Sequence, residues 1–455
     1  MTPLGCFKAY DVRGRLGVEL NDDIARRIGR AFAQTLGAKL VVMGRDCRAS
    51  SESLMAAAVQ GVRAAGAEVL DLGLCGTEEM YFAVSHFGAD GGIEVTASHN
   101  PMDYNGMKMV RRGSAPLGAG NGLAAIRDLA ESCDFASAPT GGLRTAPWAQ
   151  AAYVARVLSF IEVPALRRLT ILVNAGNGAA GPTFDAIEAA LAASGAPLRF
   201  VKLHHLPDGS FPNGIPNPLL PENQPATANA VLAAKADFGV AWDGDFDRCF
   251  LFDHRGQFIP GEYIVGLLAE AFLAKEPGAT IVHDPRVVWN TQDVILAGGG
   301  RGILAPTGHA FLKQAMRDHG AVYGGEMSAH HYFRDFMACD SGMIPWLLIA
   351  ELISRRGISL ADLMADRIAR FPSSGEINFR LADAGAAIAR VLAVLGPESL
   401  ARDDTDGLSL TFGDWRLNLR SSNTEPLLRL NIEARGDAAL VAAGVARVRA
   451  LIEAE

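Results

Sequence analysis

The chain has 455 residues, of which 49% are hydrophobic and 20% are charged, with a formal net charge of −8 at pH 7. At about 100 to 200 residues per domain, this length predicts three or four globular domains. The acidic balance argues against a nucleic-acid-binding or membrane-surface protein, because both need a basic surface. A small anionic ligand would therefore need a local basic pocket.

No targeting signal is expected from the sequence. Residues 1–8 lack the charged segment and apolar run of a signal peptide. The most apolar stretch, residues 344–353, contains Glu351 and is far shorter than the ~18 residues that cross a membrane.

The six cysteines form no C-x-x-C pair, which favours reduced thiols. We expect a cytoplasmic protein, with no membrane and no nucleic-acid partner, that is a monomer or a homodimer.

The first 145 residues alternate between helical and strand patterns. Apolar residues recur every four positions after Asn21, which is a candidate N-cap. Further helical patterns begin at Ser51 and pass through Met80. Between them lie short apolar runs typical of strands, at residues 39–43, 68–72 and 92–96. This alternation predicts an α/β domain over residues 1–145.

The same alternation restarts twice. Residues 146–250 contain strand patterns and two helical patterns, near Pro182 and Ala226, with the strands at 170–173, 198–203 and 238–242. Residues 251–370 contain a predicted hairpin at 254–256 and strand patterns at 280–283, 302–305 and 321–324. Together with the first segment, these predict three α/β domains with parallel or mixed sheets, as a loose structural repeat.

The pattern changes in the last segment, residues 371–455. Apolar residues alternate at period two, as in strands with one solvated face, at Leu408, Leu410, Phe412, Leu417, Leu419, Leu428, Leu430 and Ile432. This predicts a small α+β domain, and Pro372, Ser373, Ser374 and Gly375 predict a hinge that leads into it. We expect the four domains to surround a central cleft, with the last one as its lid.

Polar clusters follow one strand of each α/β domain, at residues 96–101, 243–248 and 326–331. Open α/β sheets bind their ligands beyond the carboxyl ends of their strands. The three clusters are therefore expected to line one cleft.

Three carboxylates lie at i, i+2 and i+4 in the segment Asp-Gly-Asp-Phe-Asp-Arg at 243–248. Their repulsion predicts a bound cation, and oxygen ligands suit Mg²⁺ or Ca²⁺. The calcium loop of EF-hands fits poorly, because Arg248 takes its glycine position and His254 its final glutamate position. Magnesium held by Asp243, Asp245 and Asp247 is the expectation, and a solvated acidic turn is the alternative.

Ser98 lies in the segment Thr-Ala-Ser-His-Asn-Pro at 96–101, between a strand end and a proline turn. Taken singly, such a serine can simply cap a helix or close a turn. Beside a metal site and His99, it becomes a candidate nucleophile for phosphoryl transfer. No G-x-S-x-G elbow is present, which disfavours a hydrolase triad.

A third candidate is the loop Arg-Ser-Ser-Asn-Thr at 420–424, whose guanidinium, hydroxyls and amides suit a phosphate. An ordinary polar turn is the alternative. Gly176, Gly178 and Gly181 match the dinucleotide fingerprint, but the expected downstream acid is missing, so we interpret them as a tight strand-to-helix turn. His330 and His331 lack the spacing of zinc ligands.

Along essentially the whole chain, these segments resemble the α-D-phosphohexomutases. The matching motifs are those at 7–14, 96–101, 104–108, 243–248, 325–333 and 420–424. Glu326-Met327-Ser328 resembles the mannose-handling bacterial branch of that family rather than its glucose-dedicated members. The resemblance implies four domains around a central cleft, three α/β and a smaller α+β one.

The resemblance also implies a role for each matching residue. Ser98 would be the phosphoserine and, with the three aspartates, a magnesium ligand. The other catalytic residues would be Arg13, His99, Lys108, Arg248 and His330. Substrate would be bound by Tyr10, Arg286, His309, Glu326, Ser328, Arg420, Ser422, Asn423 and Thr424.

The implied activity is interconversion of mannose 6-phosphate and mannose 1-phosphate through phospho-Ser98 and a bound hexose 1,6-bisphosphate, in GDP-mannose and surface polysaccharide synthesis. The alternative is glucose phosphate or dual specificity, because Arg286, Pro306 and Ala329 depart from residues common in relatives. Rivals from other classes are a catalytically silent sugar-phosphate-binding protein and a nicotinamide dehydrogenase.

Overall fold

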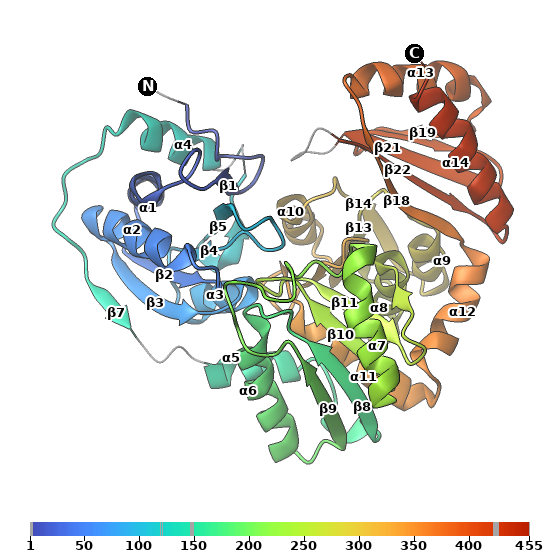
Figure 1. Ribbon diagram of the computed structural model, residues 1–455, viewed down its shortest axis with the longest axis horizontal. Coiled ribbons are helices and arrows are strands. Elements are labelled where there is room, and N and C mark those ends of the chain that lie inside the picture. Colours follow the sequence, from blue (N-terminus) through green and yellow to red (C-terminus); the bar gives the residue numbers. More distant parts are fainter. Residues whose placement is uncertain (1–2, 119, 121, 146–149, 422–426, 455) are drawn as a thin grey trace. The chain divides into compact units, whose positions relative to one another are not determined.

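The computed structural model describes residues 3–118, 120, 122–145, 150–421 and 427–454. The chain forms two compact units, Met1–Phe258 with His330–Gly357, and Ile259–Ala329 with Ile358–Glu455. Figure 1 labels the elements of both.

The first part of unit 1 is built on a mixed sheet of order β1-β5-β4-β2-β3-β7, with β6 paired to β5. Strands β2, β3, β4 and β7 run parallel, while β5 is antiparallel to both β1 and β4. Its elements are β1 Val12–Arg15, α1 Asp22–Leu36, β2 Leu40–Arg45, α2 Ser51–Ala64, β3 Glu68–Leu74, α3 Thr77–His86, β4 Gly91–Val95, β5 Tyr104–Arg111, β6 Ala115–Pro116, α4 Leu123–Ser132 and β7 Leu143–Thr145.

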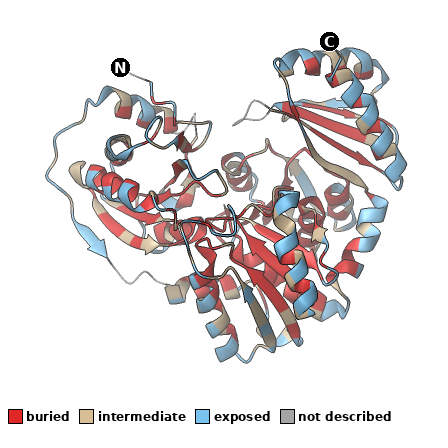
Figure 2. Ribbon diagram, viewed as in Figure 1, coloured by how far each residue is buried: buried red, intermediate tan, exposed pale blue. Residues whose placement is uncertain are grey.

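The second part of unit 1 has the sheet order β12-β11-β10-β8-β9, in which β10 pairs parallel with β8 and antiparallel with β11. In Figure 2 the central strands of this sheet are buried and the outer faces of its helices are exposed. Its elements are α5 Gln150–Leu158, β8 Leu169–Asn174, α6 Ala180–Ala193, β9 Leu198–Leu203, α7 Gln224–Ala234, β10 Phe238–Trp242, β11 Cys249–Asp253 and β12 Phe258–Ile259. Unit 1 also holds β16 His331–Phe333, β17 Cys339–Asp340 and α11 Met343–Arg356.

Unit 2 contains the parallel strands β14, β13 and β15 and a second, antiparallel sheet of order β18-β22-β21-β20-β19. Its elements are α8 Gly261–Lys275, β13 Thr280–His283, α9 Trp289–Ala297, β14 Arg301–Leu304, α10 His309–His319, β15 Tyr323–Gly325, α12 Leu360–Arg370, β18 Ser373–Arg380, α13 Ala384–Leu395, β19 Ala401–Asp403, β20 Leu408–Thr411, β21 Trp415–Ser421, β22 Leu427–Ala434 and α14 Ala438–Ile452. Along the chain, three groups of α/β elements are therefore followed by one α+β group, as the sequence predicts.

Local sequence signals explain many element boundaries. Asn21 caps α1 as predicted, since its side chain accepts a hydrogen bond from the Ile24 amide at 2.9 Å. At the other end of α1, Gly37 adopts a left-handed φ of 57° and its amide bonds to Ala33 and Gln34 carbonyls. The apolar run of β10 is buried at every position, as expected for a central strand with both faces covered.

One prediction for the last segment, that its strands have a solvated face, is wrong for three of the five described strands. In β20, β21 and β22 the polar side of the sheet is buried as well, at Ser409, Arg416, Asn418, Arg420, Asn431 and Glu433, whereas β18 and β19 keep exposed residues such as Asn378 and Arg402. Polar partners compensate this burial: Arg416 donates to the Pro285 and Arg286 carbonyls, and Glu433 accepts from the Val288 and Trp289 amides. In the predicted hinge at Pro372, Ser373, Ser374 and Gly375, β18 begins at Ser373 and pairs with β22 across a bulge between Ser373 and Glu376, and the hinge itself stays a prediction.

Candidate active site

The aspartate loop follows the carboxyl end of β10. The side chains of Asp243, Asp245 and Asp247 are buried, each with a residue exposure of 0%. The neighbouring elements hold the loop through its backbone, because Thr77 donates its amide to the Asp245 carbonyl at 3.2 Å and Ala179 donates to the Gly244 carbonyl at 2.9 Å. A solvated acidic turn is therefore excluded.

Buried carboxylates in such numbers need positive charge nearby. The Lys108 ammonium bonds to Asp245 Oδ2 at 2.6 Å and to Asp247, and Arg248 Nε lies 3.5 Å from Asp243 Oδ2. Burial lowers the pKa of Lys108, but the attraction of Asp245 and Asp247 outweighs it and raises that pKa above its ordinary value. Burial, then repulsion from Asp247 and Asp245, raises the pKa of Asp243 to about 7.

The three aspartates also fit a divalent cation. One carboxylate oxygen from each can be chosen so that all three lie within 4.8 Å of one another. The Oδ1 atoms of Asp243, Asp245 and Asp247 have no hydrogen-bond partner among the described residues. Orphaned carboxylate oxygens on buried side chains are hard ligands of the kind that Mg²⁺ prefers.

Ser98 lies directly against this loop, although it follows β4 rather than β10. Its hydroxyl donates to Asp243 Oδ2 at 2.6 Å, and its Oγ is 2.9 Å from His99 Nδ1. The turn itself is closed by the backbone bond from the Asn100 amide to the Ala97 carbonyl. The Ser98 hydroxyl is therefore directed at the aspartates and does not close the turn.

His99 is a neutral imidazole in this environment. Burial lowers its pKa well below the usual value, and the positive charges of Arg248, Arg13 and Lys108 lower it further. A neutral ring next to the Ser98 hydroxyl can accept or donate a proton according to its tautomer.

The remaining predicted catalytic residues gather round the same loop in unit 1. Arg13 donates to Asp11 Oδ2 at 2.8 Å and to Asn100 Oδ1 at 3.1 Å. Arg248 Nε donates to His330 Nε2 at 3.2 Å, and this histidine nitrogen is 3.6 Å from Asp247 Oδ1. Tyr10 is half-buried and immediately precedes Asp11.

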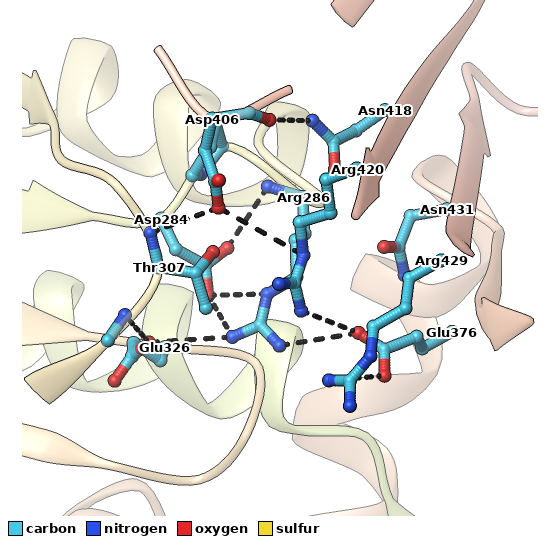
Figure 3. A network of polar contacts seen from close by, with 12 residues as sticks. Asp284, Arg286, Thr307, Glu326, Glu376, Asp406, Asn418, Arg420, Arg429 and Asn431 are labelled. Carbon is cyan, nitrogen blue, oxygen red and sulfur yellow. Dashed lines mark hydrogen bonds and ion pairs between the residues drawn. The ribbon is translucent and has the colours of Figure 1, made fainter. Parts of the chain in front are cut away.

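A second polar group, in unit 2, contains the predicted sugar-recognition residues (Figure 3). Arg286 is only 4% exposed, and its guanidinium bonds to Asp284 Oδ2 through Nε at 3.0 Å. Its Nη2 atom lies 3.3 Å from Ser328 Oγ and 3.7 Å from Glu326 Oε1. Glu326 also accepts the Gly308 amide at 2.9 Å, next to His309 at the start of α10.

The same network continues into the antiparallel sheet of unit 2. Glu376 binds three guanidinium groups, with Arg420 at 3.1 Å, Arg429 at 3.2 Å and Arg286 at 3.6 Å (Figure 3). The attraction of these arginines lowers the pKa of Glu376 although burial opposes it. Asp284, Glu326 and Glu376 balance the three guanidinium groups within this network, so its suitability for an anionic ligand lies in the planar donors of the arginines and not in an excess of positive charge. Ser422, Asn423 and Thr424 lie outside the described residues.

Two further positions bear on the sequence interpretation. Ala329 has a φ of 69°, in the left-handed region that favours glycine, so a glycine would adopt this backbone conformation with less strain than alanine does. A Cβ on Gly178 would lie 2.7 Å from the Gly244 carbonyl oxygen, and one on Gly181 would lie 1.9 Å from the His205 carbonyl oxygen. These glycines permit close packing, in agreement with a tight turn.

Several polar residues of these groups were not singled out from the sequence. They include Asp11, Arg48, Thr77, Asp284, Asp340, Glu376, Asp406 and Arg429. Thr77 donates its hydroxyl to Asp245 Oδ2 at 2.6 Å, and Asp340 joins Asp247 and His330 in a second set with metal-ligand spacing. Only Asp284 carried a usable signal, because it directly follows a predicted strand and precedes Arg286 by two residues.

Comparison with known proteins agrees with this architecture. Family models of the phosphoglucomutase/phosphomannomutase alpha/beta/alpha domains I, II and III match residues 5–136, 151–256 and 260–371. The model of the C-terminal domain of the same family matches residues 376–451.

Curated relatives match over nearly the full length. A phosphomannomutase of Salmonella montevideo is 59% identical over 455 residues, which cover 99% of this chain and 100% of the relative. A protein named phosphohexose mutases from Xanthomonas campestris pv. campestris is 57% identical over 96% of this chain and 97% of its own length. A crystal structure of a phosphoglucomutase/phosphomannomutase family protein from Burkholderia thailandensis matches with a TM-score of 0.87 and 33% identity, covering 100% of this chain and 98% of that one.

The chain belongs to the phosphoglucomutase/phosphomannomutase family. It is an enzyme, an intramolecular phosphotransferase of the isomerase class. Within the described residues, none of the helices combines the length and apolar character that a membrane crossing requires.

If the three aspartates bind Mg²⁺, the substitution Asp245→Asn should weaken the stabilisation of the protein by that ion. A ligand that binds only the folded protein stabilises it by about 2.7 kcal/mol at 100 times its Kd. Mg²⁺ should therefore raise the thermal unfolding temperature of the wild type, whereas Asp245→Asn should lose most of that increase, because one charged ligand is removed. Differential scanning calorimetry with and without Mg²⁺ measures both, and Asp128→Asn, at an exposed position, is the control. An undiminished increase in Asp245→Asn would refute the metal assignment.

Proposed function

We propose that this enzyme is a phosphomannomutase that interconverts mannose 6-phosphate and mannose 1-phosphate through phospho-Ser98. The observation that carries the proposal is the position of the Ser98 hydroxyl, 2.6 Å from Asp243 and 2.9 Å from His99. A buried hydroxyl bonded to a carboxylate with metal-ligand spacing suits a phosphoryl carrier. The proposed substrate follows the names of the relatives at 52–59% identity and the Glu326-Met327-Ser328 motif.

The proposed reaction consists of two phosphoryl transfers, the first from Ser98 to the sugar and the second from the sugar back to Ser98. Phospho-Ser98 donates its phosphoryl to O6 of mannose 1-phosphate or to O1 of mannose 6-phosphate. The bond from phosphorus to Ser98 Oγ breaks as the bond to the sugar oxygen forms, the sugar hydroxyl loses its proton, and Ser98 regains one. The product is a bound mannose 1,6-bisphosphate, which must turn around so that its other phosphoryl returns to Ser98.

The charged residues of unit 1 supply proton transfer and charge stabilisation in this proposal. His99, as a neutral imidazole beside Ser98 Oγ, can exchange a proton with that atom. Arg13, Lys108 and Arg248 offset the charge on the transferring group, and His330 is the candidate that accepts the proton of the sugar hydroxyl. Bound by Asp243, Asp245, Asp247 and Ser98, Mg²⁺ would supply further charge neutralisation.

The residues of unit 2 are proposed to hold the part of the substrate that does not react. Arg420, with Ser422, Asn423 and Thr424 in the segment that follows it, would bind the distal phosphate. Glu326 would accept hydrogen bonds from sugar hydroxyls, Ser328 would donate or accept them, and Arg286 and His309 would contact the same ligand. Tyr10, in unit 1, is a further proposed substrate-binding residue. We further propose domain boundaries at 1–145, 146–250, 251–370 and 371–455. We also propose that the enzyme is cytoplasmic, that it is a monomer or a homodimer, and that it acts in the pathway to GDP-mannose and surface polysaccharide.

Sugar preference tests the substrate part of the proposal. We expect kcat/KM to be about tenfold or more higher for mannose 1-phosphate than for glucose 1-phosphate, because a site that hydrogen-bonds sugar hydroxyls discriminates their stereochemistry. A coupled mutase assay that includes glucosamine phosphate makes the comparison. Equal or higher values for glucose 1-phosphate would favour a glucose or dual-specificity enzyme, and no turnover of any of them would favour a silent binding protein.

Ser98→Ala tests the carrier itself. The variant should fold and still bind substrate, because Ser98 lies outside the strands and its hydroxyl adds little to a hydrophobic core. Turnover should fall by orders of magnitude, since no other hydroxyl lies next to Asp243 and His99 among the described contacts. Mass spectrometry of the wild type should find phosphate on a peptide containing Ser98, and excess monophosphate should discharge it into bisphosphate. The matched control is Ser53→Ala, whose hydroxyl bonds only to the Ser50 carbonyl on the exposed start of α2.

Near-normal turnover of Ser98→Ala, or fully active wild type without phosphate on Ser98, would rule out the proposed carrier. If Ser98 only stabilised its turn, the substitution would instead cost about 1 kcal/mol of stability and leave catalysis intact.

A further inference from the structure

Arg48 is a buried cation that lies outside the proposed catalytic residues. It follows the carboxyl end of β2, and only 2% of its surface is exposed. β2 is the parallel neighbour of β4 in the first sheet. The segments that follow these two strands, with Arg48 in one and Ser98 in the other, therefore emerge side by side.

The guanidinium of Arg48 binds the Ser98 segment entirely through backbone carbonyls. Nη2 donates to the carbonyls of Ser98 at 2.9 Å and Asn100 at 2.5 Å. Nη1 donates to the carbonyls of Pro101 at 3.0 Å and Tyr104 at 3.3 Å. Four carbonyl oxygens of this segment thus converge on one planar cation, and one of them, that of Pro101, also accepts the Tyr104 amide at 3.1 Å.

This arrangement accompanies an unusual backbone conformation at Ser98. Its φ is 48°, in the left-handed region that a serine rarely adopts without support. The Ser98 amide donates to Thr96 Oγ1 at 2.9 Å, and its carbonyl is held by Arg48, so both peptide groups of the residue are fixed. The direction of the Ser98 hydroxyl towards Asp243 follows from that backbone conformation.

Arg48 is itself held in place from three sides. Asp46 Oδ1 accepts the Arg48 amide at 2.9 Å and the Ser51 hydroxyl at 2.5 Å, and Asp46 Oδ2 is 3.6 Å from Arg48 Nε. The ring of Phe211 lies 5.5 Å from the guanidinium carbon, within cation–π range. A Cβ on Gly209 would lie 2.2 Å from the Cys47 carbonyl oxygen, so the two segments pack closely.

We propose that Arg48 is a positioning residue of the phosphoryl-transfer reaction: by binding the carbonyls of Ser98, Asn100, Pro101 and Tyr104, it sets the backbone that directs the Ser98 hydroxyl at the aspartate loop. It contacts neither the hydroxyl nor Asp243. The inference rests on the proposed role of Ser98 as carrier. A lysine cannot replace Arg48, because an ammonium presents its donors from one point rather than as a planar fork.

The test compares Arg48→Met and Arg48→Lys with a matched control, Arg30→Met. Arg30, on α1, also donates to a backbone carbonyl, that of Ala136, and lies over an aromatic ring, that of Phe135. Neither partner belongs to the Ser98 segment. Circular dichroism and thermal unfolding establish that each variant is folded at the assay temperature. Steady-state kinetics and hydrogen–deuterium exchange of the peptide spanning residues 97–104 are then measured.

A misplaced nucleophile should lower kcat on the order of 100-fold, with KM for the monophosphate changed by no more than about threefold. We expect this for Arg48→Met, a smaller loss for Arg48→Lys, and no loss for Arg30→Met. Deuterium uptake at residues 97–104 should increase in both Arg48 variants but not in Arg30→Met. Added guanidinium or methylguanidinium at millimolar concentrations should restore part of the Arg48→Met turnover, which a loss of global stability would not allow.

The proposal is overturned if folded Arg48→Met or Arg48→Lys keeps wild-type kcat, or if kcat falls while exchange at residues 97–104 stays unchanged. If Arg48→Met does not fold, Arg48→Lys alone decides, because it keeps the positive charge. Failure of the proposed function is recognised separately, by wild type that turns over without phosphate on Ser98. In that case the exchange measurement still tests whether Arg48 holds the segment.

Discussion

Mutual repulsion of three buried aspartates is the constraint on which unit 1 depends. Two unit charges 4 Å apart repel by about 4 kcal/mol at an effective dielectric constant of 20. Ligand oxygens of Asp243, Asp245 and Asp247 lie within 4.8 Å of one another, so the loop is stable only with compensating charge. Lys108 from β5 and Arg248 supply part of it, and the orphaned Oδ1 atoms indicate that a further cation belongs there.

The start of α3 shows how the fold supports this loop from separate segments of unit 1. Thr77 bonds to Asp245 through both its hydroxyl and its amide. The next residue, Glu78, accepts the Gly342 and Met343 amides at the start of α11 at 2.5 and 3.2 Å. Glu79 accepts the Thr183 hydroxyl of α6 at 2.7 Å. Three consecutive polar residues thus connect three segments distant in sequence, and burial raises the pKa of both glutamates, to about 8 and about 7.

Local patterns predicted the elements well, because amphipathic periodicity, the Asn21 cap and the buried run of β10 are short-range signals. The same patterns predicted that polar clusters follow β4, β10 and β15, which they do. The patterns wrongly predicted a solvated face for strands β20, β21 and β22 of unit 2. Arg416 and Glu433 on that face are buried, and the backbone groups that they bond to lie more than 125 positions away in the sequence. Arg48 was missed for the same reason, since its carbonyl partners are about 50 residues distant and leave no periodicity or motif.

The aspartate loop and Ser98 are proposed to form one cation site. Anomalous X-ray diffraction from crystals soaked in Mn²⁺, a chemical substitute for Mg²⁺, tests it most directly. We expect one strong peak bonded to an oxygen of each of Asp243, Asp245 and Asp247, with the Ser98 hydroxyl or its phosphate as a further ligand, and the Lys108 ammonium displaced from Asp245 or Asp247. No peak at this loop, with Lys108 still bonded to both aspartates at saturating Mn²⁺, would contradict it.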